Sequence, residues 1–240
     1  MSERIAKAMS RLGACSRRDA ERFIAAGRVS VNGKVIDSPV IFVTDEDTIM
    51  LDGTSLQGKA PTQLWRYHKP LGLITSHDDP EGRPTVFDGL PESLPRVMSV
   101  GRLDLNSEGL LLLTNDGELA RYLEHPSTGW ARKYKVRMRG VPSEETIRSL
   151  KKGVSIEGVS YRGIGVKLAQ SGGNSWADLT LSEGKNREIR RVFEHYGHPV
   201  SRLIRTSYGP FQLGKLAPGE VEPIKHRALK NALGKQFALS

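Results

Sequence analysis

The residues best suited to carry out chemistry lie in the segment Gly-Arg-Leu-Asp-Leu-Asn-Ser-Glu-Gly at positions 101–109. This segment joins two predicted strands, and loops at strand ends are where a rigid scaffold often holds catalytic groups. Asp104 stands between Leu103 and Leu105, whose apolar side chains would shield a carboxylate from water. Its spacing alone favours a simpler interpretation, in which Asp104 closes an Asx turn. The residue pattern therefore nominates Asp104 as a catalytic carboxylate without deciding between the two.

Other reaction chemistries find little support in the sequence. The six histidines are scattered, and the one close pair, His195 and His198, straddles a glycine at a predicted helix end, so we expect no metal site. The glycine patterns of nucleotide-binding loops and the Gly-x-Ser-x-Gly motif of serine hydrolases are absent. The single cysteine, Cys15, can form no intramolecular disulfide, which indicates a reducing compartment.

The charge balance favours a polyanionic partner. The 240 residues include 36 lysines and arginines against 27 acidic residues, a formal net charge of +9. A membrane-surface protein would need a long basic amphipathic helix, and no segment has that pattern, so nucleic acid is the expected partner and no membrane is expected. The longest apolar run, Leu110 to Leu113, is far too short to span a bilayer. Residues 1–13 contain no apolar stretch behind a basic start, so we expect a cytoplasmic protein.

The first fifty residues predict a small unit that begins with two helices. Apolar residues at helical spacing favour a helix over residues 5–12. Ser16 and Asp19 form a capping-box pattern, which predicts a second helix through Ala25. Gly27 follows at a typical position for a helix C-terminal cap.

A hairpin is predicted next, followed by a linker. Asn32-Gly33 between residues 29–31 and 34–36 is a strong hairpin signal, because both turn residues tolerate the positive φ that a type I′ turn requires. Gly, Ser, Gln, Lys, Pro and Thr dominate the stretch after residue 52, which is typical of a linker. We therefore predict an N-terminal domain over residues 1–52, a linker over 53–62 and a second domain over 63–240.

The second domain alternates short strands with helices and has no detectable repeat. Strands are predicted at 64–68, 98–100, 110–114, 133–139, 177–181 and 200–206. Helices are predicted at about 117–124, 144–151 and 187–196. Asn186 is expected to cap the last helix, and Gly197 and Pro199 to end it. Irregular alternation of this kind favours an α+β fold over a regular βαβ repeat.

Basic residues gather in three places. The first set lies on the second helix and the hairpin and comprises Arg17, Arg18, Arg22, Arg28 and Lys34. Unpaired N–H groups at a helix start favour phosphate, so this set suits RNA, although a solvated helix face explains the charge equally well. The compactness of the set within a small separate unit favours RNA.

The other two sets lie in the second domain. Along residues 133–139, apolar side chains alternate with four cations, and no acid lies between them. Such a strand face, with positive charges only, is unusual. A solvated face is nevertheless the commoner explanation for a single strand. Lys185, Arg187, Arg190 and Arg191 cluster at the start of the last helix. Because the helix dipole disfavours cations at that end, an anionic partner is the better explanation.

These segments together resemble one enzyme family. Residues 101–104 and 107–117, Gly-Arg-Leu-Asp and Ser-Glu-Gly-Leu-Leu-Leu-Leu-Thr-Asn-Asp-Gly, resemble the signature of the RsuA/RluB/RluE/RluF family of pseudouridine synthases. His68-Lys69-Pro70 with Gly72 is similar to the family's first motif, Lys133-x-x-Val136 around Tyr134 to its tyrosine motif, and residues 183–191 to its third. The N-terminal unit resembles the S4-type RNA-binding domain of most members.

The resemblance implies a fold and a reaction. The expected fold is α+β, with a small S4-type domain of two helices and a hairpin, and a catalytic domain built on a mixed, largely antiparallel central sheet with a cleft. The expected reaction cleaves the glycosidic bond of a uridine, rotates the base and reattaches it through carbon 5, with no cofactor or metal. Asp104 would be the catalytic carboxylate, Arg190 would pair with it, and Tyr134 would stack on the base.

The resemblance also implies the partner. The RNA-binding residues that we predict are Arg17, Arg18, Arg22, Arg28, Lys34, Lys69, Arg102, Lys133, Lys185, Arg187 and Arg191. The N-terminal unit, the stretch at residues 80–85 and the strand around Lys133 and Tyr134 are most similar to the RluB branch, which implies large-subunit (23S) ribosomal RNA or an assembly intermediate as the partner. We also expect a monomer. One departure is Glu188, where the family usually has Gln.

Three alternatives stay open at this point. One is a synthase that acts on small-subunit (16S) ribosomal RNA. Another is a non-catalytic RNA-binding assembly factor, which would have no need of Asp104 and Arg190. The third is a nucleoside hydrolase using Asp104 and Glu108 as paired carboxylates, although Gly109 and the apolar run after it indicate a loop that enters a strand.

Overall fold

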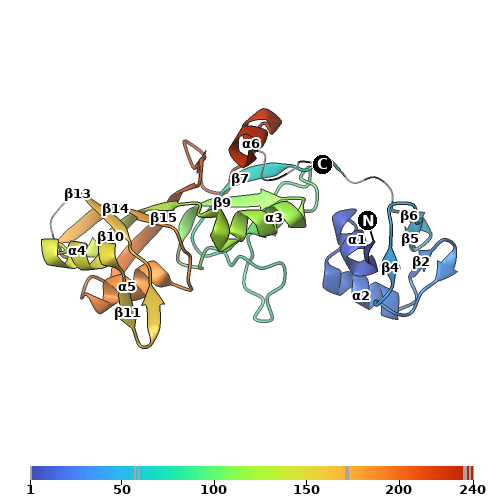
Figure 1. Ribbon diagram of the computed structural model, residues 1–240, viewed down its shortest axis with the longest axis horizontal. Helices are drawn as coiled ribbons and strands as arrows, with labels where there is room; N and C mark the ends of the chain where they lie inside the picture. The colour runs from blue at the N-terminus through green and yellow to red at the C-terminus, as the bar shows by residue number, and fades with distance from the viewer. Residues whose placement is uncertain are drawn as a thin grey trace.

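The computed structural model describes residues 2–56, 58, 60–170, 173–234, 237 and 239 (Figure 1). Residues 2–55 form an N-terminal unit, drawn in blue at one end of Figure 1. The elements after residue 63 form a second unit around a nine-stranded sheet. Residues 57 and 59 of the predicted linker lie outside the described residues.

The N-terminal unit contains two helices and two small sheets. Its elements are β1 (Glu3–Arg4), α1 (Ile5–Arg11), α2 (Arg17–Ala25), β2 (Val29–Val31), β3 (Lys34–Val35), β4 (Phe42–Val43), β5 (Ile49–Leu51) and β6 (Thr54–Ser55). The four-stranded sheet has the order β3-β2-β5-β6, and β1 pairs with β4. β6 falls within the stretch predicted as linker, because Thr54 and Ser55 pair with β5.

Local chemistry explains the first elements of this unit. Ser16 Oγ accepts a hydrogen bond from Asp19 N at 3.0 Å, and Asp19 Oδ2 accepts one from Ser16 N at 3.3 Å, so the predicted capping box starts α2. Asn32 (φ 52°) and Gly33 (φ 80°) form the predicted hairpin turn between β2 and β3. The fully buried Ile5 and Ile24 join the two helices in one core.

The second unit contains the larger share of regular structure. Its strands are β7 (Leu64–Lys69), β8 (Met98–Val100), β9 (Glu108–Thr114), β10 (Arg132–Arg139), β11 (Val154–Ile156), β12 (Val159–Tyr161), β13 (Gly165–Gln170), β14 (Asn174–Leu181), β15 (Val200–Tyr208), β16 (Phe211–Gln212) and β17 (Val221–Pro223). Its helices are α3 (Gly117–Glu124), the short 3₁₀ helix η1 (Pro126–Thr128), α4 (Glu144–Lys152), α5 (Glu188–His195) and α6 (His226–Leu233).

The central sheet has the order β13-β14-β10-β15-β9-β7-β17, with β8 paired to β9 and β16 to β15. Every neighbouring pair is antiparallel except β15 and β9, which run parallel. The sheet is therefore mixed and largely antiparallel, and the α+β prediction is confirmed.

Gly109 makes the parallel pairing of β9 with β15 possible. It lies opposite Arg205, with a φ of 103° that favours glycine. A Cβ at this position would lie 2.4 Å from the carbonyl oxygen of Arg205 and 2.7 Å from its nitrogen. The absence of a side chain thus lets β9 approach β15 closely, which places the loop before β9 beside the middle of the sheet.

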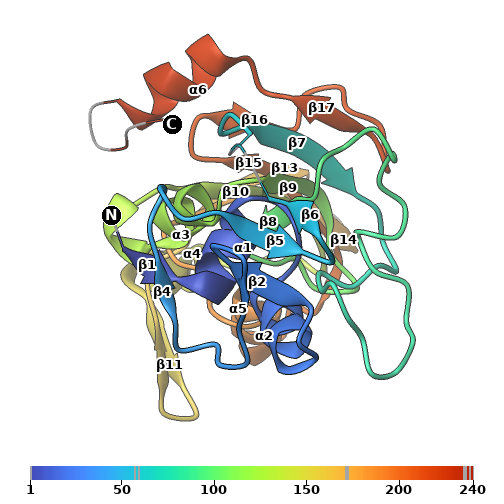
Figure 2. The same ribbon diagram turned by 90° about the vertical axis from the view of Figure 1, so that its right-hand side faces the viewer.

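Both faces of the sheet are covered in its β9 and β7 half. Leu110 and Leu112 belong to a core beneath α3 and α6, whereas Leu111 and Leu113 belong to a second core on the opposite side. Burial on both faces explains the uninterrupted apolar run. Figure 2 shows α6 and α5 on opposite sides of the sheet. α5 and α4 cover β10, β14 and β13 from the side that carries the second core.

The predicted N-cap of α5 is wrong by one residue. Asn186 was expected to cap the helix, but the N-cap is Arg187, which has a left-handed conformation (φ 49°) and makes no side-chain cap hydrogen bond. This reversal turns the loop at residues 183–187 back toward β10. Sequence patterns did not indicate β11, β12, β13, β16, β17 and α6.

Candidate active site

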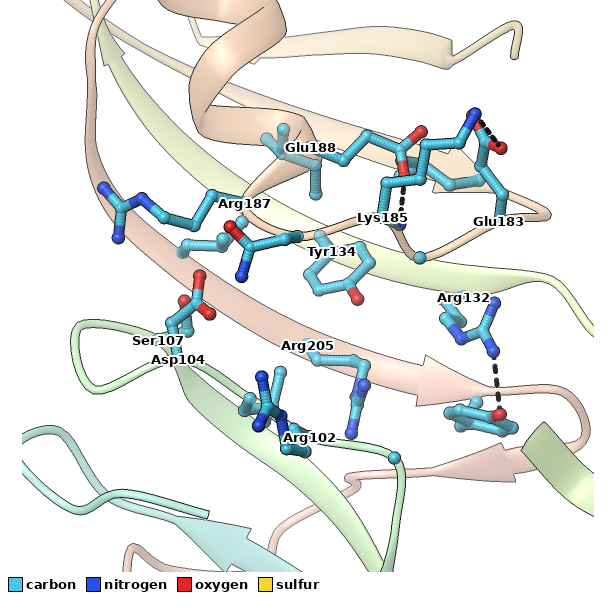
Figure 3. A pocket seen from close by; sticks show the side chains of 18 residues that line it. Arg102, Asp104, Ser107, Arg132, Tyr134, Glu183, Lys185, Arg187, Glu188 and Arg205 are labelled. Atoms are coloured by element: carbon cyan, nitrogen blue, oxygen red, sulfur yellow. Dashed lines mark hydrogen bonds and ion pairs between the residues drawn. The ribbon is translucent and has the colours of Figure 1, made fainter. Parts of the chain in front are cut away.

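A cavity of about 260 Å³ opens in the second unit over β15, which contributes Leu203, Arg205 and Tyr208, and between three further segments (Figure 3). The loop before β9 contributes Arg102 and Asp104, and β10 contributes Arg132 and Tyr134. The loop at residues 183–187 forms the third wall. The sequence segments that resembled three separate motifs therefore meet around one hollow.

Asp104 is half-buried on the wall formed by the loop before β9. Its carbonyl accepts a hydrogen bond from Ser107 N at 2.9 Å, which closes the turn. The neighbouring Leu103 is buried, and its carbonyl accepts a hydrogen bond from Thr75 Oγ1 at 2.9 Å. Leu105, which was expected to shield Asp104 as well, is exposed. The carboxylate thus has an apolar support on one side and the open cavity on the other.

Lys69 requires a correction, because it was predicted to bind RNA. Its side chain is fully buried, and its ammonium donates to the carbonyls of Pro70 at 2.9 Å and Ser107 at 2.8 Å. Burial lowers the pKa of Lys69 to about 8, against the opposing charges of Asp104 and Glu108. Lys69 therefore fixes the loop that carries Asp104 and supplies positive charge from beneath it, rather than a contact for RNA.

Arg190 also departs from its predicted role. It was expected to pair with Asp104, but its guanidinium donates to the carbonyls of Val200 at 2.9 Å and Asn106 at 2.5 Å. Within the described residues it forms no ion pair with Asp104 and does not line the cavity. Burial lowers the pKa of Arg190, and the charge of Asp104 opposes that shift, so the two groups lie within electrostatic range. Arg190 holds the Asp104 loop through its backbone.

Tyr134 lies where the resemblance predicted it. It is half-buried on β10, opposite Arg205 on β15 and Leu179 on β14, and its ring lines the cavity across from Asp104 (Figure 3). An aromatic ring in this position offers a face on which a flat base can stack. The pairing of β10 with both neighbours holds the ring in place.

Two arginines of the cavity were not predicted. Arg132 donates to Tyr208 Oη at 2.9 Å, with its guanidinium 4.7 Å from the centre of that ring. Arg205 is buried and donates from Nε to the carbonyl of Leu110 at 2.6 Å, while its buried Nη2 has no partner among the described residues. An arginine inside the apolar strand predicted at 200–206 was the available signal, since buried arginines usually serve a partner.

The third wall carries a pair of linked carboxyl groups. Glu188 is buried and accepts a hydrogen bond from Lys185 N at 3.0 Å, while Glu183 accepts one from Arg162 N at 2.5 Å. Glu188 Oε1 is buried without a hydrogen-bond partner among the described residues, and the charge of Glu183 acts on the same carboxyl group. Burial and the neighbouring Glu183 charge raise the pKa of Glu188 to about 7, so Glu188 holds a proton at lower pH.

The predicted RNA-binding residues divide by location. Arg102, Lys185 and Arg187 line the cavity, although the ammonium of Lys185 is engaged by Glu183 at 3.1 Å and by the carbonyl of Ser160. Lys133 is exposed on the opposite face of β10, and Arg191 is exposed on α5 away from the cavity wall.

The N-terminal set is exposed on α2 and the hairpin. Arg22 pairs with Asp19, and Arg28 pairs with Asp52 at 2.5 Å while it covers the Phe23 ring at 4.4 Å. Arg17, Arg18 and Lys34 have no ion pair among the described residues. These three cations are therefore the ones free to meet phosphate.

The cavity and the N-terminal unit correspond to two known domains. A family model described as RNA pseudouridylate synthase matches residues 63–195, and one for the S4 domain matches residues 3–49. The chain belongs to the RNA pseudouridylate synthase family. The enzyme class and the S4 RNA-binding domain predicted from the sequence are therefore confirmed.

Individual relatives of this pseudouridine synthase agree. The chain is 48% identical over 229 residues to "Uncharacterized RNA pseudouridine synthase" of Rickettsia bellii (strain RML369-C), covering 95% of this chain and 99% of the relative. It is 45% identical over 225 residues to "Ribosomal large subunit pseudouridine synthase B" of Salmonella typhi, covering 91% and 77%. A crystal structure of a pseudouridylate synthase superposes with a TM-score of 0.69 at 25% identity, covering 95% and 99%.

Other site types find no support in the described part of the synthase. Among the described residues, no group of three or more His, Cys, Asp or Glu side chains is arranged to hold a metal ion. No described helix is long and apolar enough to cross a membrane. Glu108, the second carboxylate of the hydrolase alternative, starts β9 and pairs with Arg202 at 2.5 Å outside the cavity.

Proposed function

We propose that this synthase converts a uridine of large-subunit ribosomal RNA to pseudouridine, with Asp104 as the catalytic carboxylate. The observation that supports Asp104 is its lack of partners. Three carboxyl groups line the cavity, and Glu183 and Glu188 each accept a hydrogen bond from a backbone N–H group. The Asp104 carboxylate alone among them has no ion pair or side-chain hydrogen bond within the described residues.

The reaction needs a nucleotide that has left its stack. Extrusion of a uridine from structured RNA costs a few kcal/mol, and contacts with the RNA backbone supply that energy. The rim carries Arg102 and Arg187, both exposed and both beside Asp104 in Figure 3. Arginines hold phosphate through paired N–H groups, which suits them to fix the nucleotides on either side of the extruded base.

The isomerisation conserves every atom of the base. The bond between N1 and the ribose C1′ breaks, the uracil rotates, and a bond forms from C5 to C1′. A proton leaves C5 and a proton is taken up at N1. Asp104 would act either by attack on C1′ or by removal of the C2′ proton through a glycal, and both fit a carboxylate at the ribose side of the cavity. Tyr134 would stack on the base while it rotates.

Two positive groups close to Asp104 would hold its loop in place. Lys69 lies beneath the loop and Arg190 behind it, each bonded to backbone carbonyls rather than to the carboxylate. An arrangement of this kind stabilises the anion without occupying its lone pairs. Arg205, with an unpartnered buried N–H group, would donate to an oxygen of the base or ribose.

Pseudouridine mapping on ribosomal RNA tests the proposed substrate. RNA from a deletion strain would be treated with carbodiimide and read by primer extension, then compared after complementation with the wild-type chain or with Asp104→Asn. One primer-extension stop in the large-subunit RNA should be lost in the deletion strain. It should reappear after complementation with the wild-type chain and not with Asp104→Asn. A stop in the small-subunit RNA, or none in either, would overturn the assignment to the large subunit.

A further inference from the structure

The sheet carries a second strongly basic surface on the side opposite the cavity. On β10, Tyr134 faces the cavity, whereas Lys133, Lys135, Arg137 and Arg139 project from the other face and are all exposed. Lys167 on β13 and Arg202 on β15 are exposed on the same face, because they occupy the same register rows. These six side chains, Lys133, Lys135, Arg137, Arg139, Lys167 and Arg202, are here called the outer basic face.

Strand pairing fixes the layout of this face. Lys135 lies opposite Asp178 on β14 and Ile204 on β15, and Lys167 lies on the other side of Asp178. Ile204 packs against the core beneath α3 and α6. The outer basic face therefore continues the α3 and α6 side of the sheet, past the part that those helices cover.

The charges of this face are largely uncompensated. Arg137 lies directly opposite Arg202, and like charges in such positions destabilise a sheet unless an anion is present. Arg202 pairs with Glu108, but the four cations that β10 contributes to this face have no ion pair among the described residues. Asp178 is the exposed acid between them, and the Lys135 ammonium lies 5.4 Å from the Trp176 ring. The catalytic mechanism uses none of these groups.

The spacing suits a phosphate backbone. Cations at alternate positions of a strand are about 6.8 Å apart in one line, comparable to the separation of successive phosphates in a nucleic acid strand. A membrane surface would favour apolar side chains that insert among lipids, and the ring of Trp176 is half-buried under Lys135. The geometry thus favours RNA.

We propose that the outer basic face binds the phosphate backbone of a second segment of the substrate RNA, remote from the uridine in the cavity. This inference rests on the proposed function, since it takes the substrate to be a large folded RNA. It predicts that a long RNA is held on both sides of the sheet, whereas a short fragment occupies the cavity alone.

Salt dependence of RNA binding by the full chain tests the proposal. The face variant would be Lys135→Gln, Arg137→Gln and Arg139→Gln together. The matched control would be Arg148→Gln, Lys151→Gln and Lys152→Gln, which removes the same charge from α4 on the other side of the sheet. The probes are a protein-free large-subunit RNA transcript and a short fragment carrying the mapped uridine.

For the long transcript, the face variant should lose at least about tenfold in affinity at about 0.15 M salt, and its log-log slope should fall by about 0.9 for each lost phosphate contact. The control variant should keep the wild-type slope, and the short fragment should bind both variants alike. Equal slopes for the two variants on the long transcript would overturn the proposal. Loss of binding to polyglutamate without loss on RNA would also overturn it, in favour of an acidic protein.

The same preparations separate this inference from the proposed function. Pseudouridine formed by the wild-type chain in the transcript reports the catalytic assignment. If the wild type formed none there, the large-subunit assignment would fail, while the slope comparison would still decide whether the outer basic face contacts RNA. Thermal unfolding of both variants checks that neither has lost its fold.

Discussion

At the scale of single residues, the polar groups that line the cavity differ in whether other groups of the protein already bind them. Glu183, Glu188 and Lys185 are each engaged by a hydrogen bond or an ion pair on one wall. Asp104 and the Arg205 Nη2 are left with unused bonding capacity in the same cavity. Buried polar groups that keep such capacity are costly unless a ligand completes them. These two groups are thus available to a ligand in the cavity.

Replacing Asp104 with Asn preserves shape and removes the charge. Pseudouridine formation should fall by at least about 10²-fold, because both candidate routes need an ionised carboxylate. RNA affinity, measured by filter binding, should stay within about twofold. Glu144→Gln on exposed α4 provides a control that should leave turnover unchanged. Turnover of wild-type size in the Asn variant would remove Asp104 from its role.

The sequence predicted which residues approach one another more reliably than what each one binds. Asp104 and Tyr134 line one cavity as the resemblance implied. Lys69 and Arg190 lie nearby, but both donate to backbone carbonyls, and no motif reveals which carbonyls a fold leaves unsatisfied. Arg205 was missed because its environment depends on strand pairing between distant segments.

At the scale of elements, the position of the site depends on the close contact between β9 and β15. Gly109→Ala would place a Cβ 2.4 Å from the Arg205 carbonyl oxygen. The free energy of unfolding should fall by at least about 3 kcal/mol, since backbone strain and steric overlap combine. Urea denaturation measures the loss.

Gly197→Ala is the matched control for this prediction. Gly197 has a positive φ of 79°, and a Cβ added there would meet no atom within 4 Å, so the variant isolates the backbone cost of about 1–2 kcal/mol. Equal losses in the two variants would show that the close approach of β9 and β15 adds nothing.

The loop before α5 should respond to pH through Glu188. Its carboxyl group keeps a proton in the folded chain up to a pKa of about 7, whereas the unfolded chain loses it near 4.5. Folding therefore takes up a proton between these values, and the free energy of unfolding should decline as pH rises through that window. Glu188→Gln retains the bond from Lys185 N and removes the titration.

We expect the variant to gain stability relative to the wild type between pH 4.5 and about 7, by on the order of 2 kcal/mol, and to keep a constant advantage at higher pH. Urea unfolding at a series of pH values measures the difference. The exposed Glu144→Gln should track the wild type throughout. Parallel profiles for Glu188→Gln and wild type would contradict the raised pKa of Glu188.

Sequence patterns correctly predicted the elements whose ends are set by interactions between neighbouring residues. The capping box of α2, the Asn32-Gly33 hairpin and the bounds of α3 and β8 follow from adjacent residues. The short strands β16 and β17 were missed because they exist only through pairing with β15 and β7. The Asn186 cap was wrong because the left-handed Arg187 serves the loop rather than the helix.

At the scale of the whole molecule, RNA binding is expected to be divided between the S4 domain and the catalytic domain. Replacing Arg17 and Arg18 with Ala should weaken RNA binding and reduce its log-log salt slope by about 0.9 per lost contact. Arg22→Ala is the neighbouring control, because Asp19 already neutralises that arginine, and its slope should change less. An unchanged slope in the double variant would exclude α2 from the RNA contact. The domain boundaries at residues 52 and 63 stay a prediction.

The insertion of β15 between β9 and β10 has a consequence for synthesis on the ribosome. Residues 204 and 205 pair with residues 108 and 109. The strand that follows the Asp104 loop therefore lacks this pairing until almost a hundred further residues have been synthesised. The S4 domain is complete long before that. A nascent chain would therefore complete its RNA-binding domain first and its candidate active site only near the end of translation.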